Sequence, residues 1–286
     1  MMKLLSSPRL VGIIGYPLEH TLSPPMHNAA FQYLGLDYVY VPFAVPPGRL
    51  AEAVQGIRAL HIAGCNVTIP YKEQVIPFLD HLDDGAARIG AVNTIVNRDG
   101  ELWGYNTDGP GFLRSLREEA GLELEGKAVL ILGAGGAARA VAFALAGAGA
   151  GRLIIANRHY DKGHKLAREL TNGGARAAEA VELKPEVLQH CLARVDILVN
   201  TLPLGMYPQV ETMPPLCGEW LNPPLVVCDL IYNPRKTKLL AAAEQRGCRI
   251  LNGEGMLVYQ GAEAFRLWTG QEAPALIMRR VLNQYL

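Results

Sequence analysis

Polar side chains follow several predicted strands in the first third of the chain, where they could bind a small ligand. These residues are Ser23, Asn66, Thr68, Lys72, Asn93, Thr94, Asn106, Thr107 and Asp108. Because ligands of open α/β sheets bind beyond the carboxyl ends of the strands, we expect a site where these residues gather. Turns also favour Asn, Asp, Ser and Thr for backbone reasons, so the pattern alone does not separate a site from ordinary turns.

Lys72, in the stretch NVTIPYKEQV, raises a more specific question. A lysine just past the end of a strand is usually a solvated surface charge, and on its own Lys72 favours that interpretation. The alternative is that its ammonium group is placed to move a proton in a reaction. Other motifs in the sequence are needed to choose between these two interpretations.

A glycine-rich turn in the middle of the chain has the spacing of a dinucleotide-binding motif. In the stretch GAGGAA, Gly133 and Gly135 hold the first two positions and Ala138 holds the third. The first glycine permits a tight turn, the second lets the backbone approach a pyrophosphate, and the small third residue lets helix and strand pack closely. The motif follows an apolar strand and opens a helix, which is the context that it requires. A tight turn without a ligand is the remaining interpretation.

The residues after the next strand bear on which dinucleotide binds. That strand ends at Asn157 and Arg158, with Lys162 close behind. An NAD site is expected to carry an acidic residue here for the ribose 2′-hydroxyl, whereas arginine suits a 2′-phosphate. The sequence therefore predicts NADP (NADPH), and Asp161, the first acid available, leaves NAD as an alternative.

The elements that must position these residues alternate between strand and helix, which favours a largely parallel sheet. Residues 91–106 predict two strands joined by a turn at Asp99-Gly100. Residues 127–158 predict a βαβ unit of about thirty residues, and further strands are expected at 195–203, 225–232 and 248–253.

The first predicted helix, in the stretch SPPMHNAAFQYLGL, has a clear start signal. Ser23 is expected to be its N-cap, with prolines in the first turn. The helical period places one apolar set on a single face, which we expect to be buried: Met26, Ala29, Ala30, Tyr33 and Leu34.

Composition excludes several classes of function. The 286 residues carry 27 Lys and Arg against 27 Asp and Glu, so there is no basic field for nucleic acid or an anionic membrane. The five cysteines are scattered without a C-x-x-C pair, which indicates reduced thiols in a cytoplasmic protein, and no metal site is expected. The first ten residues are too short for a signal peptide, and Arg139 and Arg152 interrupt the most apolar stretch, so no membrane span is expected.

The chain resembles the shikimate dehydrogenase family (shikimate/quinate dehydrogenases) over nearly its full length. The resemblance rests on motifs that occur in the family's order and spacing: GYPLEHTLSPPMHNAAF, NVTIPYK, GAVNT, GYNTDG, GAGGAAR, NR, NTLPLGM, DLIYNP with TKLL, and GEGMLVYQGAEAF. It implies an enzyme, an NADP-dependent oxidoreductase that reversibly reduces 3-dehydroshikimate to shikimate in the biosynthesis of chorismate and aromatic amino acids. The implied partner is therefore a small-molecule substrate, and the chain is expected to be a monomer or a homodimer.

The resemblance also implies roles for individual residues. Lys72 and Asp108 match the catalytic pair. The matches to substrate-binding positions are Thr21, Ser23, Asn66, Thr68, Asn93, Tyr232 and Gln260. The matches to cofactor-binding positions are Gly133, Ala134, Gly135, Gly136, Ala137, Asn157, Arg158, Lys162, Thr201, Gly253 and Met256.

The implied architecture is α/β with two domains. Residues 1–108 and 255–286 are expected to form an N-terminal α/β substrate domain, to which the last helices return because Gln260 must reach substrate. Residues 109–254 are expected to form a Rossmann-like NADP-binding domain, with the active-site cleft between the two domains.

Two departures from the family pattern leave alternatives open. Thr21 stands where the family usually has serine, and its methyl group could change tolerance for quinate. His159 and Lys162 follow Arg158 in place of a threonine and a second arginine, so the charge survives without the bidentate fork. The alternatives are a quinate/shikimate dehydrogenase that uses NAD and a non-catalytic sensor of shikimate-like acids. A sensor would be expected to lack Lys72 or Asp108, and both are present.

Overall fold

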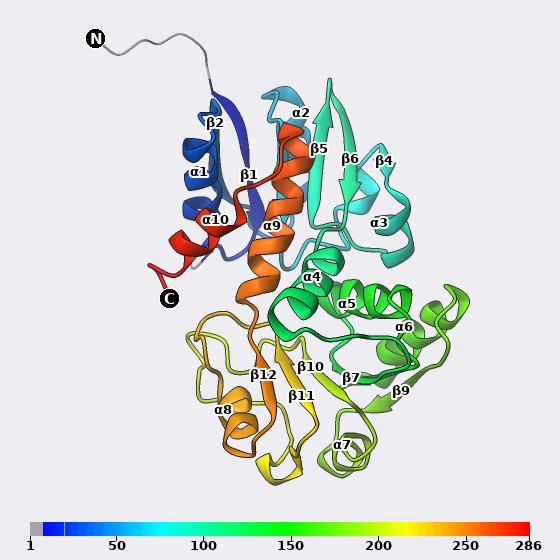
Figure 1. Cartoon of the computed structure of the whole chain (residues 1–286). Helices are drawn as coiled ribbons and strands as arrows, with labels where there is room; N and C mark the ends of the chain where they lie inside the picture. Colours follow the sequence, from blue (N-terminus) through cyan, green and yellow to red (C-terminus); the bar gives the residue numbers. More distant parts are fainter. Residues whose placement is uncertain (1–7, 20) are drawn as a thin grey trace. The chain divides into compact units, whose positions relative to one another are not determined.

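The chain divides into two compact units. The computed structural model describes residues 8–19 and 21–286. By internal contacts, one unit combines the residues up to Thr107 with Val258–Tyr285, and the other contains Asp108–Leu257 and Leu286 (Figure 1). The second boundary between the units, between Leu257 and Val258, falls inside one helix, α9 (Glu254–Thr269). Each unit is a sheet covered by helices, which confirms the predicted α/β fold, whereas the assignment of substrate and NADP to separate domains stays a prediction.

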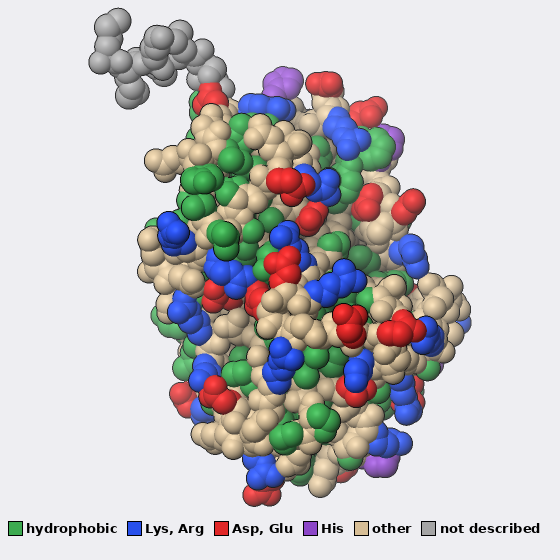
Figure 2. All heavy atoms as spheres, viewed as in Figure 1, with side chains coloured by type: hydrophobic (Ala, Val, Ile, Leu, Met, Phe, Trp, Pro, Cys, Tyr) green, Lys and Arg blue, Asp and Glu red, His purple; other side chains and the backbone are tan. Residues whose placement is uncertain are grey.

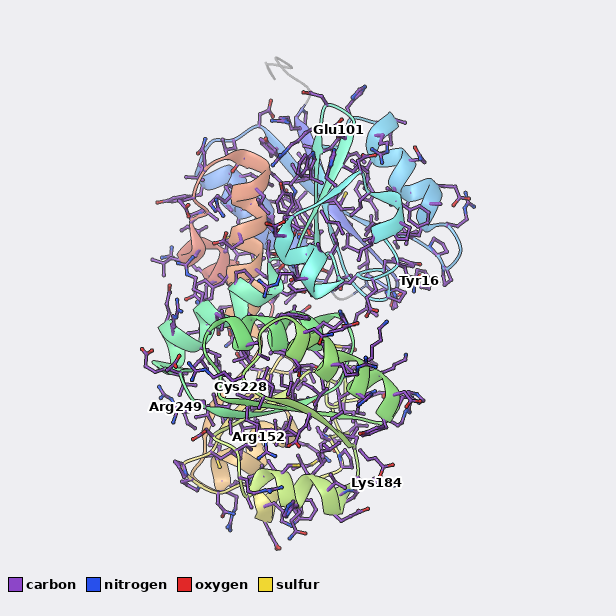
Figure 3. All side chains as sticks on the ribbon, turned by 90° about the vertical axis from the view of Figure 1, so that its right-hand side faces the viewer. Tyr16, Glu101, Arg152, Lys184, Cys228 and Arg249 are labelled. Carbon is purple, nitrogen blue, oxygen red and sulfur yellow. The ribbon has the colours of Figure 1, made fainter. Side chains whose placement is uncertain are left out.

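The sheet of the first unit brings several strand ends to one edge. Its strands follow the order β2-β1-β3-β5-β6-β4. Strands β2, β1 and β3 are parallel, whereas β5 is antiparallel to β3 and β6 is antiparallel to β5. The C-terminal ends of β1, β3 and β6 and the N-terminal end of β5 therefore lie along the same edge of the sheet, the edge at which strand ends meet. Figure 3 labels Tyr16 just after β1 at this edge and Glu101 at the opposite edge. The strands are β1 (Arg9–Gly15), β2 (Tyr38–Ala44), β3 (Gly64–Val67), β4 (His81–Leu82), β5 (Thr94–Arg98) and β6 (Glu101–Tyr105).

Helices cover both faces of this sheet (Figure 1). Apolar residues of α2 and α3 pack with Ile14, Val67 and Ile95 on one face. On the other face, α1 and α9 contribute to an aromatic layer in which Phe31 stacks on Phe265 with ring centroids 4.9 Å apart. The helices are α1 (Ser23–Tyr33), α2 (Leu50–Ala59), α3 (Asp84–Ile89), α9 and α10 (Ala275–Leu282), with a 3₁₀ turn at Ile76–Phe78.

Helix α1 differs from its prediction in two respects. Leu22 occupies the N-cap position and Ser23 is the first helical residue, so the expectation of a Ser23 N-cap is wrong. Tyr33 is 64% exposed, while His27 and Phe31 are buried. The aromatic layer on the sheet faces the side of the helix that carries His27 and Phe31, so tertiary packing rather than helical period selects the buried face.

The sheet of the second unit is parallel throughout, with the strand order β12-β11-β10-β7-β8-β9. In sequence order this is the Rossmann arrangement, in which the chain reverses direction across the sheet between the first and fourth strands, here β7 and β10. Figure 3 labels Arg152 on β8, Cys228 on β11 and Arg249 on β12. The strands are β7 (Ala128–Leu132), β8 (Arg152–Asn157), β9 (Ala178–Glu182), β10 (Ile197–Asn200), β11 (Val226–Asp229) and β12 (Arg249–Leu251).

Helices also cover both faces of the second sheet (Figure 1). Residues of α4, α5 and α6 pack on one face, and residues of α7 and α8 pack on the other. These helices are α4 (Asp108–Ala120), α5 (Gly136–Gly147), α6 (Tyr160–Asn172), α7 (Pro185–Leu192) and α8 (Lys238–Gln245), with a 3₁₀ turn at Gly218–Trp220.

Two surface properties bear on the predicted partners. On the face drawn in Figure 2, basic and acidic side chains are interspersed, in keeping with the equal numbers of the two signs in the sequence. Among the described residues, no helix is long and apolar enough to cross a membrane.

The buried histidine of α1 is held neutral inside the aromatic layer. His27 is 0% exposed and stacks on Tyr40, with ring centroids 4.5 Å apart and an interplanar angle of 2°. Among the residues that the structure describes, neither ring nitrogen of His27 has a hydrogen-bond partner. Burial lowers the pKa of His27 to about 3, because the charged ring would lose its hydration.

We therefore expect His27 to weaken the fold in acid. Between pH 6.5 and about 3 the unfolded chain binds a proton at His27 that the folded chain does not. The free energy of unfolding therefore decreases by up to about 1.4 kcal/mol for each unit by which the pH is lowered. His27→Phe keeps the stack and removes this loss, so its advantage over the parent in urea unfolding should grow from pH 8 to pH 5. His190→Gln, at an exposed position of α7, is the control. An advantage for His27→Phe that does not depend on pH would contradict the account.

Candidate active site

Asn93 ties together the strand ends at one edge of the first sheet. Its backbone N–H donates to the Tyr105 carbonyl at 3.0 Å, and its carbonyl accepts from the Val67 N–H at 2.8 Å. Its side-chain Oδ1 accepts from the Thr107 N–H at 2.8 Å, and its Nδ2 donates to Thr107 Oγ1 at 2.9 Å. The residue is 2% exposed. Asn93 thus fixes the end of β3, the start of β5 and the segment that follows β6.

Asn66 lies beside Asn93 in the same buried network. Its Nδ2 donates to the Asn93 carbonyl at 3.2 Å and to Thr94 Oγ1 at 3.1 Å. Its Oδ1 accepts a hydrogen bond of 2.7 Å from the hydroxyl of Tyr40. The two predicted amide ligands are therefore adjacent, and both are held before any substrate arrives.

Lys72 and Asp108 are each linked to Asn93 through one intervening residue. The Lys72 carbonyl accepts from the Val92 N–H at 2.7 Å, so Lys72 is anchored next to the residue that precedes Asn93. Asp108 directly follows Thr107, the partner of the Asn93 side chain. Asp108 is 4% exposed and opens α4, where the positive end of the helix dipole favours a carboxylate.

Four further predicted substrate ligands belong to the first unit. Asn93 Nδ2 donates to Gln260 Oε1 at 3.4 Å, so the return of α9 brings Gln260 to the network. Ser23 is buried, and its backbone N–H donates to Thr21 Oγ1 at 3.4 Å. Thr68 follows β3 at the same edge, and its N–H donates to the Ile14 carbonyl at 2.9 Å.

In the second unit the first motif glycine is required by the backbone. Gly133 has φ of +114°, a conformation that side chains disfavour, and a Cβ there would collide with Thr201 Oγ1. Thr201 Oγ1 in turn donates to the Leu132 carbonyl at 2.7 Å. The predicted cofactor residues Gly133 and Thr201 therefore lie together, at the switch point between β7 and β10.

The second motif glycine leaves open space. A Cβ added at Gly135 would meet nothing within 4 Å, so the fold itself does not require glycine there. Gly135 is exposed and is the N-cap of α5, whose first turn carries no acidic residue. An open backbone at a helix N-terminus suits a pyrophosphate, and Ala134, Gly136 and Ala137 complete this turn. The residues present therefore fit a dinucleotide.

The end of β8 presents positive charge. Arg158 and Lys162 are both exposed; Arg158 precedes the N-cap of α6, and Lys162 lies in the first turn of that helix. Asn157 Nδ2 donates to the His159 carbonyl at 2.9 Å and so shapes the turn that carries Arg158. This arrangement fits a 2′-phosphate.

Asp229 organises the loops that follow β10 and β11. It accepts from Thr237 Oγ1 at 2.7 Å, from Asn200 Nδ2 at 3.0 Å and from the Ile231 N–H at 3.2 Å. Burial raises the pKa of Asp229 to about 6, although these three donors act in the opposite direction. The loop that Asp229 holds carries Tyr232, whose pKa burial also raises, so that its hydroxyl stays protonated.

The last two predicted cofactor residues lie close to this loop. Gly253 N–H donates to the Ile231 carbonyl at 3.0 Å, and a Cβ at Gly253 would collide with the Leu230 carbonyl. Met256 packs into the core of the second unit and is 8% exposed. Contact of either residue with a nicotinamide stays a prediction.

Family models match most of the chain. The shikimate dehydrogenase substrate binding domain matches residues 13–95, shikimate / quinate 5-dehydrogenase matches 115–202, and the shikimate 5'-dehydrogenase C-terminal domain matches 253–282. A shikimate dehydrogenase (NADP(+)) of Moorella thermoacetica is 53% identical over 284 residues, which is 99% of this chain and 96% of that protein. The chain belongs to the shikimate dehydrogenase family.

Solved structures of the family agree with this fold. A shikimate dehydrogenase crystallised in complex with NADP+ is 44% identical, with a TM-score of 0.90 and coverage of 98% of this chain and 96% of that one. A shikimate 5-dehydrogenase of Listeria monocytogenes, in complex with shikimate and NAD, is 40% identical, with a TM-score of 0.90 and coverage of 99% of both chains. The family predicted from the sequence motifs is confirmed.

The sequence alone does not identify two residues that organise the candidate site. Tyr40 binds the Asn66 amide, but in its strand it resembles Tyr38, and only the packing of α1 and β3 distinguishes the two. Asp229 lies in the stretch DLIYNP but is not among the predicted site residues, although an aspartate that closes an apolar strand is a recognisable signal of a loop anchor.

The two motif glycines allow a matched pair of substitutions. Gly133→Ala should lower the free energy of unfolding by roughly 1–3 kcal/mol, because it strains the backbone and crowds Thr201. Gly135→Ala should lower the melting temperature less than Gly133→Ala does, since it makes no clash, and still raise the KM for NADP+ about tenfold or more, because its methyl stands where the pyrophosphate approaches. Thermal unfolding and steady-state kinetics measure both. Unchanged NADP+ binding in Gly135→Ala would show that the pyrophosphate does not contact this turn.

Proposed function

We propose that this protein catalyses the reversible NADPH-dependent reduction of 3-dehydroshikimate to shikimate, within chorismate and aromatic amino acid biosynthesis. The observation that carries the proposal is 53% identity over 99% of the chain with a protein named shikimate dehydrogenase (NADP(+)). The buried amides and hydroxyls of the first unit support it, since they suit a ligand with several hydroxyl groups.

The first unit binds the substrate. Ser23 and Thr21 hold the carboxylate, while Asn66 and Asn93 hold ring hydroxyls. Thr68 and Gln260 are the other ligands from this unit, and Tyr232, a residue of the second unit, completes the predicted set. Because the amides are already hydrogen-bonded to the protein, little side-chain entropy is lost when the substrate binds.

Lys72 and Asp108 carry out the proton chemistry. When bound, NADPH supplies a hydride to the carbonyl carbon of the substrate. The carbonyl oxygen then gains negative charge, which the ammonium of Lys72 stabilises and neutralises by donating a proton. Asp108 orients that ammonium group and accepts from a substrate hydroxyl. In the reverse direction Lys72 takes the proton back from the hydroxyl that is oxidised.

The second unit holds the cofactor. The turn from Gly133 to Ala137 receives the pyrophosphate at the start of α5, and Arg158 with Lys162 holds the 2′-phosphate. Asn157 and Thr201 fix the turns around these groups. Gly253 and Met256 lie by the nicotinamide. Relatives named for NADP(+) support the choice of NADP over NAD.

The quinate/shikimate dehydrogenase that uses NAD is the less favoured alternative. Its supports are Thr21 and the replacement of the second arginine by His159 and Lys162. A further support is that the Listeria relative was crystallised in complex with shikimate and NAD. The non-catalytic sensor is disfavoured because Lys72 and Asp108 are both present. A cytoplasmic location and a monomeric or homodimeric state remain predictions.

The activity is tested by the absorbance of reduced nicotinamide with the purified protein. Shikimate and quinate are each combined with NADP+ and with NAD+. The proposal expects the highest kcat/KM for shikimate with NADP+. If reduced nicotinamide forms only with quinate and NAD+, the result would favour the quinate/shikimate dehydrogenase that uses NAD. If none forms in any combination, the result would favour the non-catalytic sensor.

The catalytic role of Lys72 predicts a large effect on turnover. Lys72→Ala should lower kcat for shikimate roughly a thousandfold or more with little change in KM, because the proton donor acts mainly in the transition state. Lys184→Ala, at an exposed residue labelled in Figure 3, is the matched control and should keep the parent rate. Turnover by Lys72→Ala within tenfold of the parent would exclude the role.

The role of Arg158 predicts an effect confined to one cofactor. Arg158→Ala loses a charged contact worth about 1.5–3 kcal/mol, so the KM for NADP+ should rise tenfold or more while the KM for NAD+ changes little. Arg168→Ala, farther along α6, serves as the control for loss of a surface charge. Equal changes in the two KM values would mean that Arg158 does not bind the 2′-phosphate.

A further inference from the structure

The orientation of the Asn66 amide is fixed by its neighbours in the first unit. The Asn93 carbonyl can only accept a hydrogen bond, so the Asn66 group that faces it at 3.2 Å must be the amide nitrogen. The second hydrogen of that nitrogen goes to Thr94 Oγ1 at 3.1 Å. Both amide hydrogens of Asn66 are therefore used inside the protein.

This orientation turns the amide oxygen of Asn66 toward Tyr40. Their distance is 2.7 Å, and because the oxygen can only accept, the phenol must be the donor. A carbonyl oxygen has two lone pairs, and the phenol takes one of them. Asn66 can thus offer a ligand one acceptor position and no donor, so it selects a ligand hydroxyl that donates.

The fold holds the Tyr40 ring unusually firmly for a residue outside the predicted site. Tyr40 is 1% exposed and stacks on the neutral ring of His27. Asn28 clamps the backbone of Tyr40 on both sides, since its Oδ1 accepts from the Tyr40 N–H at 2.8 Å and its Nδ2 donates to the Tyr40 carbonyl at 2.9 Å. The phenol is therefore presented to Asn66 at a set place.

We propose that Tyr40 is a positioning residue that fixes the orientation of the Asn66 amide, so that Asn66 presents its one remaining acceptor position to a ring hydroxyl of the substrate. This inference rests on the proposed function and adds the ligand chemistry that the site selects. That ligand is a carboxylic acid whose ring hydroxyl donates to Asn66. Tyr40 does not touch the reacting atoms, so it acts on binding and not on the proton transfer.

The test is Tyr40→Phe, which keeps the ring, the stack and the backbone clamp and removes only the hydroxyl. Isothermal titration should show shikimate binding weakened about fivefold to thirtyfold, because the Asn66 amide is no longer held in the orientation that accepts from the ring hydroxyl. The KM for shikimate should rise by the same factor while the KM for NADP+ stays within twofold. A merely structural residue would lower the melting temperature without this separation between the two substrates.

Tyr38→Phe is the matched control, since Tyr38 lies on the same strand and donates its hydroxyl to the Trp268 carbonyl at 3.2 Å, away from Asn66. It should bind shikimate as the parent does. Equal losses of shikimate binding in the two variants would overturn the inference.

A double-variant cycle tests whether Tyr40 acts through Asn66. In an Asn66→Ala background the acceptor is gone, so Tyr40→Phe should change shikimate binding by less than twofold. A further fivefold loss there, or unchanged binding in Tyr40→Phe alone, would overturn the inference while leaving the proposed function intact. A parent protein that neither binds nor oxidises shikimate would contradict both.

Discussion

The need to satisfy buried amide groups controls this molecule's proposed substrate site. Asn66 and Asn93 are 5% and 2% exposed, and a buried amide without partners would cost more free energy than one hydrogen bond returns. Their partners are the Asn93 carbonyl, the Thr107 N–H and neighbouring hydroxyls, so the same bonds that satisfy the amides also join strand ends. Folding and preparation for the substrate are therefore one process in the first unit.

In the second unit the proposed cofactor site depends on backbone conformation, whereas the proposed substrate site of the first unit depends on buried amide side chains. At Gly133 the chain takes a conformation that excludes a side chain, and Thr201 fills the space beside it. At Gly135 nothing fills the space, which is what a cofactor phosphate needs. Asp229 then holds the loop of Tyr232 with three hydrogen bonds, and its raised pKa reflects the cost of burying that carboxylate.

Much of the fold and of the candidate site could be predicted from the sequence, because local sequence patterns indicate local structure. The glycine turn, the hairpin at Asp99-Gly100 and the clustering of polar strand ends all depend on short stretches. Strand β9 (Ala178–Glu182) was missed, since an edge strand with exposed residues lacks the apolar run of a central strand. The burial of His27 and the part played by Tyr40 depend on packing between distant segments, which no local pattern carries.

The most direct test of the account is a high-resolution crystal structure of the protein with shikimate. The account predicts that the carboxylate binds at Ser23 and that ring hydroxyls lie within about 3 Å of Asn66 Oδ1 and the Asn93 side chain. It also predicts that the Asn66 amide nitrogen still faces the Asn93 carbonyl, as it does without ligand. Shikimate bound away from these amides, or bound only after the Asn66 amide has rotated, would contradict the claim that the site is organised in advance.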